Sequence, residues 1–117
     1  MPLLHITTPN LPATPEARQA ILKQLSALVA RSLGKPEHYV MIALSPTVGM
    51  LFAGTEGPAC YAELKNVGQL PPEEVEKLSE ILCDALSRGF AVPKDRIYLE
   101  FTNADGALWG WNGTTFA

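Results

Sequence analysis

The second residue of the chain is the most unusual candidate for chemistry in the sequence. Pro2 follows Met1, and a methionine before a small residue such as proline is generally removed during maturation. Removal would leave a secondary amine at the start of an apolar run. An amine at a buried strand end is poorly hydrated when charged, so its pKa falls and it can act as a base near neutral pH. Taken alone, a Met-Pro start is common and indicates no chemistry, so the context decides.

A nearby cation would lower the proton affinity of such an amine further, and Lys35 is the candidate for that cation. Lys35 directly follows Gly34, at the expected end of a helix. The alternative is that Lys35 is a solvated residue that complements the helix dipole.

Other residue types that perform catalysis or bind metals do not form recognisable arrangements. The sequence contains no nucleophile elbow, phosphate-binding loop or HExxH motif. Cys60 and Cys83 are too far apart for a CxxC pair or a zinc site, and we expect two buried thiols. His5 and His38 have no acidic or thiol neighbours at ligand spacing, so we interpret them as structural or surface histidines. We expect neither a metal nor a cofactor.

Length and composition narrow the function classes. The 117 residues predict one domain spanning 1–117, and a formal charge of −3 without a basic run argues against nucleic-acid binding. No membrane span or signal peptide is recognisable, so we expect a cytoplasmic protein, with export by a route that needs no signal peptide as the alternative. The hydrophobic content of 47% is high for so small a domain, and predicts that another subunit covers part of the surface.

Hydrophobic periodicity places the candidate residues on a regular framework. Thr14 is a candidate N-cap, and Gly34 is a candidate C-terminal stop, for an amphipathic helix over about residues 15–33. A second helix begins at the Pro71-Pro72 pair, and its apolar stripe ends at Leu86. Strands are predicted at 3–8, 39–44, 59–66 and 96–101, with a loop at 45–58. The strand at 39–44 is apolar on both faces, which favours a central, buried position.

The order of these elements is βαβ followed by βαβ, with a proline turn before the last strand of each half. We interpret this as an internal duplication in an α+β fold, with two helices on one face of a four-stranded mixed sheet. Right-handed crossovers would make the strands of each half parallel neighbours. The face without helices is expected to be apolar and to be covered by packing several subunits around an axis.

Four segments resemble the macrophage migration inhibitory factor and D-dopachrome tautomerase family of the tautomerase superfamily, and the resemblance extends over the whole chain. The segments are Pro2-Leu3-Leu4, Gly34-Lys35-Pro36, Asp95-Arg96-Ile97-Tyr98 and the ending Gly110-Trp111-Asn112-Gly113-Thr114-Thr115-Phe116-Ala117. The resemblance implies a homotrimer with three active sites between subunits. It also implies keto–enol tautomerisation of a small enolisable carbonyl substrate, an aryl 2-oxo acid such as phenylpyruvate.

The resemblance assigns Pro2 as the general acid/base and Lys35 as the residue that holds the substrate carboxylate. The remaining substrate-binding residues are lining residues of the pocket. Tyr98 would reach in from the neighbouring subunit, and the others are Val67, Glu100, Trp111 and Phe116.

Two positions depart from the family pattern. Glu100 stands where vertebrate members carry a pocket asparagine contributed by the neighbour, and its charge could repel an anionic substrate, pair with Lys35 or stabilise the Pro2 cation. Equally, strand alternation could point Glu100 to solvent. Cys60 stands alone where the vertebrate cytokine has a CxxC pair, so we do not expect thiol–disulfide oxidoreductase activity.

The sequence is compatible with two main function classes. The first is a tautomerase, whose activity could be low. The second is a cytokine-like binding protein with a receptor partner and a vestigial pocket, and a free Pro2 amine of low pKa would separate the two. Dehalogenation or decarboxylation is a third option, but it would require arginines near Pro2, and none matches a pocket position.

Overall fold

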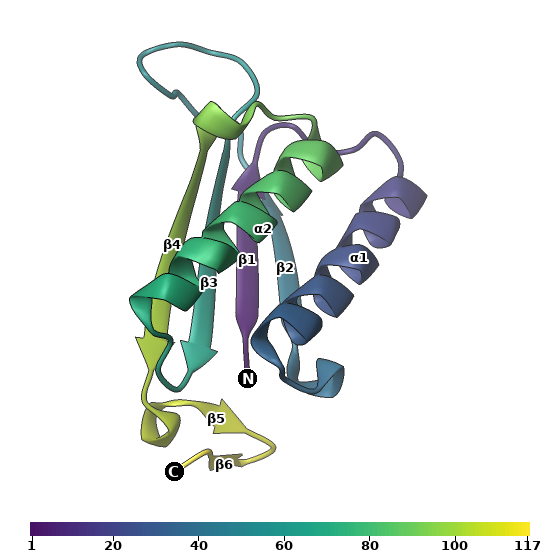
Figure 1. Ribbon diagram of the computed structural model, residues 1–117. Helices are drawn as coiled ribbons and strands as arrows, with labels where there is room; N and C mark the ends of the chain where they lie inside the picture. The colour runs from purple at the N-terminus through teal and green to yellow at the C-terminus, as the bar shows by residue number, and fades with distance from the viewer.

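The computed structural model describes all residues 1–117, and it consists of a four-stranded mixed sheet with two helices on one face (Figure 1). The strands are β1 (Leu3–Thr8), β2 (Met41–Pro46), β3 (Cys60–Val67) and β4 (Ile97–Ala104), and the helices are α1 (Pro15–Leu33) and α2 (Pro72–Phe90). Three short 3₁₀ turns are η1 (Glu37–Tyr39), η2 (Lys94–Arg96) and η3 (Gly106–Leu108). A separate C-terminal hairpin pairs β5 (Gly110–Trp111) with β6 (Thr114–Thr115).

The strand pairing confirms the predicted fold class. The sheet has the order β2-β1-β3-β4, in which β1 is parallel to β2 and β3 is parallel to β4. The two halves meet at an antiparallel β1–β3 pair that aligns Leu3 with Lys65 and Thr7 with Tyr61. The two central strands therefore begin at opposite ends of the sheet.

Neither helix combines the length and the apolar character that a membrane-spanning helix requires.

Local capping signals explain where α1 begins and ends. The Thr14 side chain accepts a hydrogen bond from the backbone N–H of Ala17 at 3.1 Å, and Pro15 occupies the first turn. Gly34 ends the helix with a φ of 64°, a left-handed conformation that glycine adopts without steric cost. The chain is thereby turned back toward the sheet at Lys35, whose N–H bonds to the carbonyl of Ala30.

The core lies between the sheet and the two helices. Alternate residues of the central strands point into it, and Leu4, Ile6 and Leu64 are almost fully buried. Leu82 and Leu86 of α2 are fully buried against them. This packing makes β1 and β3 a rigid base for the residues at their ends.

The predicted central position of strand 39–44 is wrong, because β2 forms an edge of the sheet. Its helix-facing residues, Ile42 and Leu44, pack against the core, whereas Met41 on the other face is 62% exposed. Residues 37–39 form the turn η1, so the strand itself starts at Met41. A strand with apolar residues on both faces can lie at the edge of a sheet as well as in its centre, if one of its faces is exposed. The pattern alone therefore cannot distinguish an edge strand from a central one.

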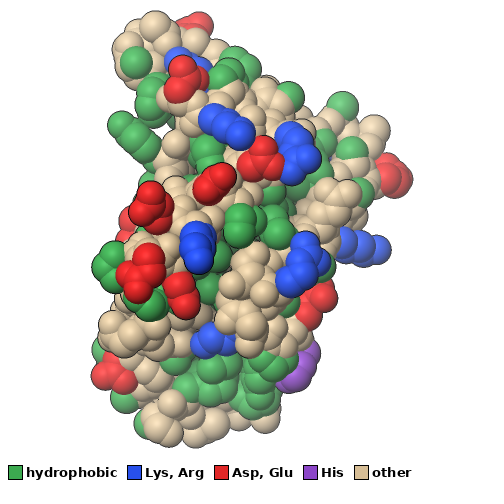
Figure 2. Space-filling model, viewed as in Figure 1, with side chains coloured by type: hydrophobic (Ala, Val, Ile, Leu, Met, Phe, Trp, Pro, Cys, Tyr) green, Lys and Arg blue, Asp and Glu red, His purple; other side chains and the backbone are tan.

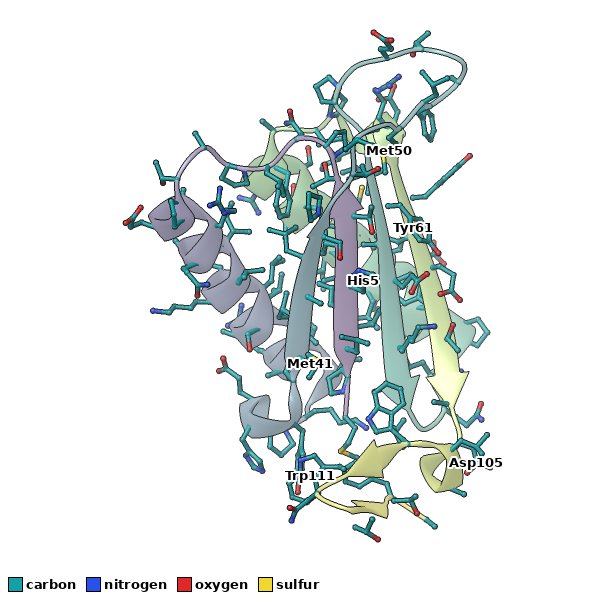
Figure 3. The ribbon with its side chains drawn as sticks, turned by 180° about the vertical axis from the view of Figure 1, so that it is seen from behind. His5, Met41, Met50, Tyr61, Asp105 and Trp111 are labelled. Atoms are coloured by element: carbon teal, nitrogen blue, oxygen red, sulfur yellow. The ribbon has the colours of Figure 1, made fainter.

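The sheet face without helices is polar, which corrects the expectation of an apolar surface (Figure 3). His5 lies near its centre and shares a 2.8 Å hydrogen bond with the hydroxyl of Ser45. The Tyr61 hydroxyl donates to Glu63 at 3.0 Å, and this hydrogen bond raises the pKa of Tyr61. Lys65 lies 3.8 Å from the same carboxylate. A face of this kind can contact water, so it gives no reason of its own for burial between subunits.

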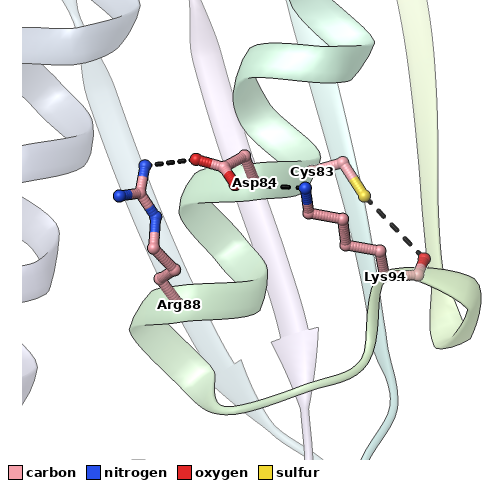
Figure 4. Close-up of polar contacts among 4 residues, drawn as sticks. All are labelled: Cys83, Asp84, Arg88 and Lys94. Carbon is pink, nitrogen blue, oxygen red and sulfur yellow. Dashed lines mark hydrogen bonds and ion pairs between the residues drawn. The ribbon is translucent and has the colours of Figure 1, made fainter.

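A polar cluster joins α2 to the turn η2 (Figure 4). The Asp84 carboxylate pairs with Arg88 one helical turn away and with Lys94 at 3.1 Å. The hydrogen bond from Lys94 is the first cause of the lowered pKa of Asp84. The Cys83 thiol donates to the Lys94 carbonyl at 3.8 Å.

Both cysteines are free, and Cys60 is buried whereas Cys83 is half-buried. Burial raises the pKa of the Cys60 thiol to about 11, so Cys60 is an unreactive thiol.

Helix α2 ends on a residue whose conformation is costly. Ala91 caps the helix in the left-handed region, with φ 55° and ψ 47°. Replacing Ala91 with Gly is expected to raise the free energy of unfolding by about 0.5–1 kcal/mol, because glycine has no Cβ to clash in this region. Urea denaturation measures the change. The matched control is Ala20→Gly in the exposed interior of α1, which should lower stability by about 1 kcal/mol; a shift of the same sign in both variants would contradict this explanation.

Candidate active site

A pocket of about 210 Å³ opens at the end of the sheet where β1 begins. Three parts of the chain form it: the N-terminal residues, the turn η1 with the start of β2, and the C-terminal hairpin. Figure 2 shows apolar side chains gathered around the hairpin at this lower end of the molecule. The lining residues are Met1, Pro2, Leu3, His38, Tyr39, Val40, Met41, Trp109, Gly110, Trp111 and Phe116.

Pro2 lies at the inner side of this pocket and is less than 2% exposed. Its carbonyl accepts a 3.0 Å hydrogen bond from the N–H of Met41, which extends the β1–β2 pairing by one residue. Proline has no N–H to donate within a chain, so its position just before the first strand leaves no backbone donor unpaired. The sheet therefore fixes Pro2 in the pocket.

The charge environment at this end favours a neutral amine. Burial lowers the pKa of the Met1 α-amine, and the positive charge of Lys35 lowers it further. The Lys35 ammonium donates a 3.0 Å hydrogen bond to the carbonyl of Val67, which holds it beside the N-terminus. Lys35 and Val67 are thus close to Pro2 but do not line the pocket itself. Their contact is through the Val67 backbone, not through its side chain.

Three aromatic rings form one wall of the pocket. Tyr39 meets Trp111 edge-on at 5.3 Å and Phe116 edge-on at 5.8 Å, measured between ring centroids. Trp111 and Phe116 are stacked, with centroids 5.8 Å apart and planes at 19°. Pairs at these separations attract one another beyond the area they bury. Only Trp111 and Phe116 are nearly parallel, and a planar ligand could stack on this pair.

The C-terminal segment is tied down so that Phe116 keeps its place. The N–H of Phe116 is shared between the carbonyls of Gly106, at 3.0 Å, and Trp109, at 3.2 Å. A Cβ on Gly106 would lie 2.5 Å from the carbonyl oxygen of Phe116, so the close approach of these two segments depends on glycine.

Eight lining residues had no place in the sequence-based site: Met1, Leu3, His38, Tyr39, Val40, Met41, Trp109 and Gly110. His38 is exposed, lines the pocket and packs on its neighbour Tyr39 with ring centroids 4.3 Å apart. The run from 38 to 41 could have been suspected, because it follows Lys35 closely. Nothing in the sequence indicates that Trp109 turns inward. The apolar residue before it, Leu108, is 84% exposed, so apolar character alone does not predict burial here.

Tyr98 and Glu100 do not join the other predicted residues within one chain. Tyr98 lies beside Tyr61, which pairs with Thr7 at the far end of β1 from Pro2. Glu100 lies beside Glu63 at mid-sheet, on the polar face, and accepts a hydrogen bond from the Thr102 hydroxyl. Thr7 lies five positions after Pro2 along the chain, a span of roughly 17 Å at strand geometry. These side chains can serve a Pro2 pocket only if it belongs to another subunit.

The structure brings together no group of three or more His, Cys, Asp or Glu side chains that could hold a metal ion. The ionisable groups that act on the pocket are the N-terminal amine, Lys35, His38 and Tyr39. A base, a cation and an aromatic wall at one site can hold an aryl anion and move a proton on it.

Comparison with known proteins shows extensive similarity over the chain. Residues 1–117 match the sequence profile of the family described as Macrophage migration inhibitory factor (MIF). A macrophage migration inhibitory factor homolog of Brugia malayi is 38% identical over 120 residues, which cover 99% of each chain. The mouse macrophage migration inhibitory factor is 31% identical, with both chains covered completely.

Solved structures show the same similarity in three dimensions. The crystal structure of a macrophage migration inhibitory factor homologue from Prochlorococcus marinus superposes with a TM-score of 0.89 at 40% identity, and the match covers 98% of this chain and 99% of that one. The macrophage migration inhibitory factor of Trichinella spiralis superposes with a TM-score of 0.88 at 34% identity, covering 97% and 99%.

Proposed function

The chain belongs to the macrophage migration inhibitory factor family, and on that premise we propose that it is a keto–enol tautomerase of aryl 2-oxo acids such as phenylpyruvate. The observation that carries the proposal is the environment of the N-terminus. There a buried proline, an α-amine whose pKa is lowered, and a lysine held at 3.0 Å by a backbone carbonyl lie beside an aromatic wall. A cytokine-like binding protein would not require a neutral amine in this place.

The proposed reaction moves one proton and changes no oxidation state. The Pro2 nitrogen, freed by removal of Met1, takes a proton from the carbon next to the substrate carbonyl. The electrons of that C–H bond form the C=C bond of the enol, and the π electrons of the C=O bond move to oxygen. The oxygen then takes the proton from the protonated Pro2 nitrogen, which returns to its neutral form. The reverse sequence restores the ketone. A base of this kind works best when its pKa is near the working pH. Burial and Lys35 lower the pKa of the Met1 amine one residue away, and the same two causes would act on the Pro2 nitrogen once it is freed.

Lys35 has a separate role in holding the substrate. Its ammonium has three donors, of which the Val67 carbonyl uses one, so two remain for a carboxylate. The Val67 carbonyl would keep Lys35 beside the N-terminus, where the substrate carboxylate would bind. The aryl ring of the substrate would then lie against Trp111 and Phe116, whose planes are nearly parallel.

Loss of Met1 also affects the space available. Met1 is itself a lining residue, so its removal would free the proline nitrogen and widen the pocket where the substrate must enter. Within a chain that retains Met1, the Pro2 nitrogen is an amide without basicity.

The proposed active unit is a homotrimer, which is typical of the family, and its support in this chain is the exposed apolar surface. Val48, Leu51 and Met41 are more than 60% exposed, and Tyr98 is 65% exposed on the edge strand β4. Tyr98 and Glu100 point from the same face of β4, so both would approach the pocket of a neighbouring subunit. Glu100 would bring a negative charge near the substrate carboxylate and so tune substrate preference.

One sample can test the proposal with two measurements. Protein shown by intact mass to lack Met1 is expected to sediment at about three times the 12.7 kDa chain mass and to convert phenylpyruvate between its keto and enol forms. Because Tyr98 cannot reach Pro2 in its own chain, activity and trimer should be lost together on dilution. A fully active monomer would contradict the proposed assembly, and an inactive trimer lacking Met1 would contradict the proposed chemistry.

A further inference from the structure

We propose that Phe52 and Arg96 form a brace that positions Tyr98 for the active site of a neighbouring subunit. Neither residue is near Pro2 in its own chain, so each acts through Tyr98 and is a positioning residue. The inference rests on the proposed function, since it gives a cause for the orientation of a side chain which that function needs.

Tyr98 requires support because little else holds it. The residue is 65% exposed near the start of an edge strand, where no further strand covers it. Its ring contacts the ring of Phe52, with centroids 5.0 Å apart and planes tilted at 57°. An exposed tyrosine without such a contact would populate several rotamers, and docking into a neighbour would have to select one of them.

Phe52 is in turn contacted by Arg96. The guanidinium carbon of Arg96 lies 5.5 Å from the centroid of the Phe52 ring, a cation–π distance. Arg96 is two residues before Tyr98, in the turn η2 that leads into β4. Phe52 therefore contacts both Arg96 and Tyr98, and Tyr98 is the residue that would enter the neighbouring pocket.

Hydrogen bonds of the Arg96 guanidinium hold the Arg96 side chain in place. The guanidinium donates to the carbonyl of Pro58 at 2.7 Å, to the hydroxyl of Thr55 at 2.8 Å and to the carbonyl of Thr55 at 3.2 Å. A longer bond of 3.4 Å reaches the carbonyl of Phe52 itself. One side chain thus ties the loop at 47–58 to the first residues of β4, at the upper end of the molecule in Figure 1. A planar guanidinium can make these contacts at once, and a lysine cannot.

The loop supplies a defined position for Phe52. Phe52 and Thr55 exchange backbone hydrogen bonds of 3.0 and 3.2 Å, and the two residues between them, Ala53 and Gly54, have φ values of 54° and 73°. Two successive positive φ angles are characteristic of a type I′ turn, which is a tight connection with little freedom. The ring of Phe52 is consequently held by its own backbone as well as by Arg96.

The test compares variants of Phe52 in the trimeric enzyme. Phe52→Leu keeps an apolar side chain but removes the ring, and it is expected to raise the KM for phenylpyruvate by about 5–20-fold while kcat changes by less than about 2-fold. Phe52→Tyr keeps the ring and should behave as the wild type. Glu56→Gln, at an exposed position in the same loop, is the matched control and should also leave KM unchanged.

A double-mutant cycle separates positioning from general stabilisation. If Phe52 acts through Tyr98, then Phe52→Leu should have no further effect on KM in a Tyr98→Leu background. Arg96→Lys should raise KM in the wild-type background and not in the Tyr98→Leu background. Additive effects in either cycle, or an unchanged KM in Phe52→Leu, would overturn the proposal. Sedimentation confirms that each variant is still a trimer, and a shifted pH–rate profile would indicate damage to the base and also count against it.

The same variants can be examined without turnover. Binding of 4-hydroxycinnamate, an aryl carboxylate that cannot enolise, is followed by quenching of the fluorescence of Trp109 and Trp111. Wild type that binds this probe but does not act on phenylpyruvate would refute the proposed function, and the ranking of Kd values would still test the brace. Wild type that neither binds nor reacts would remove the basis for both proposals.

Discussion

Protein with a short extension ahead of Met1 that is not trimmed is expected to lose phenylpyruvate tautomerase activity by about 10²-fold or more, relative to protein that begins at Pro2. The extension converts the basic nitrogen of Pro2 into an amide, which cannot accept a proton at neutral pH. The loss should be in kcat, since the base acts in the proton-transfer step. The measurement is steady-state kinetics on two preparations whose N-termini are verified by intact mass.

A second variant separates lost basicity from a blocked pocket. Pro2→Ala, with Met1 removed, retains an α-amine but a primary one, without the ring that fits the buried site. Its activity should be reduced, and the limb of its pH–rate profile should move, because a different amine now titrates. An unchanged profile in Pro2→Ala, or full activity in the extended protein, would exclude the Pro2 nitrogen as the base.

Lys35→Met is expected to raise the KM for phenylpyruvate by about 10–100-fold, the cost of one lost charge-assisted hydrogen bond of about 1.5–3 kcal/mol. The KM for the methyl ester of phenylpyruvate should change far less, since the ester has no carboxylate to hold. The comparison of acid and ester in each variant is the measurement. Lys23→Met on the exposed face of α1 is the control, and it should alter neither substrate.

The same substitution should also move the pH profile in a defined direction. Burial and then the charge of Lys35 lower the pKa of the Met1 amine. We expect Lys35 to act in the same way on the Pro2 amine of the processed enzyme, so that its removal raises the pKa of that amine. The base is active when neutral, and kcat/KM therefore increases as pH rises through the pKa. In Lys35→Met this increase should occur at higher pH than in the wild type. Equal losses for acid and ester, with no movement of the profile, would show that Lys35 acts neither on the carboxylate nor on the base.

The fold was predictable from the sequence where the signals are local. Thr14 and Gly34 mark the ends of α1 through the hydrogen bonds and the left-handed turn that these residue types favour, and both predictions are confirmed. The position of β2 was not predictable in this way. Its apolar residues indicate that both faces of the strand can be covered. They do not indicate whether another strand pairs with its outer edge.

The candidate site was predictable only in part, for a similar reason. Pro2 stands out by its place in the chain, and Trp111 and Phe116 by resemblance to a family. Tyr39 and Trp109 become lining residues because a turn and a hairpin from distant parts of the chain meet the N-terminus. That meeting is a property of the tertiary structure, and no residue spacing encodes it.

The two βαβ halves place equivalent residues at opposite ends of the sheet. β1 and β3 are equivalent strands that start at opposite ends, so Ala59, just before β3, corresponds to Pro2. Both residues are buried, yet a polypeptide has a single α-amine, and only one strand start can carry it. A half-length ancestor that paired with itself would have possessed two such amines for every pair. Fusion of two such halves would halve the number of reactive centres and leave the second end, where Tyr98 lies, free for the proposed role in a neighbour's site.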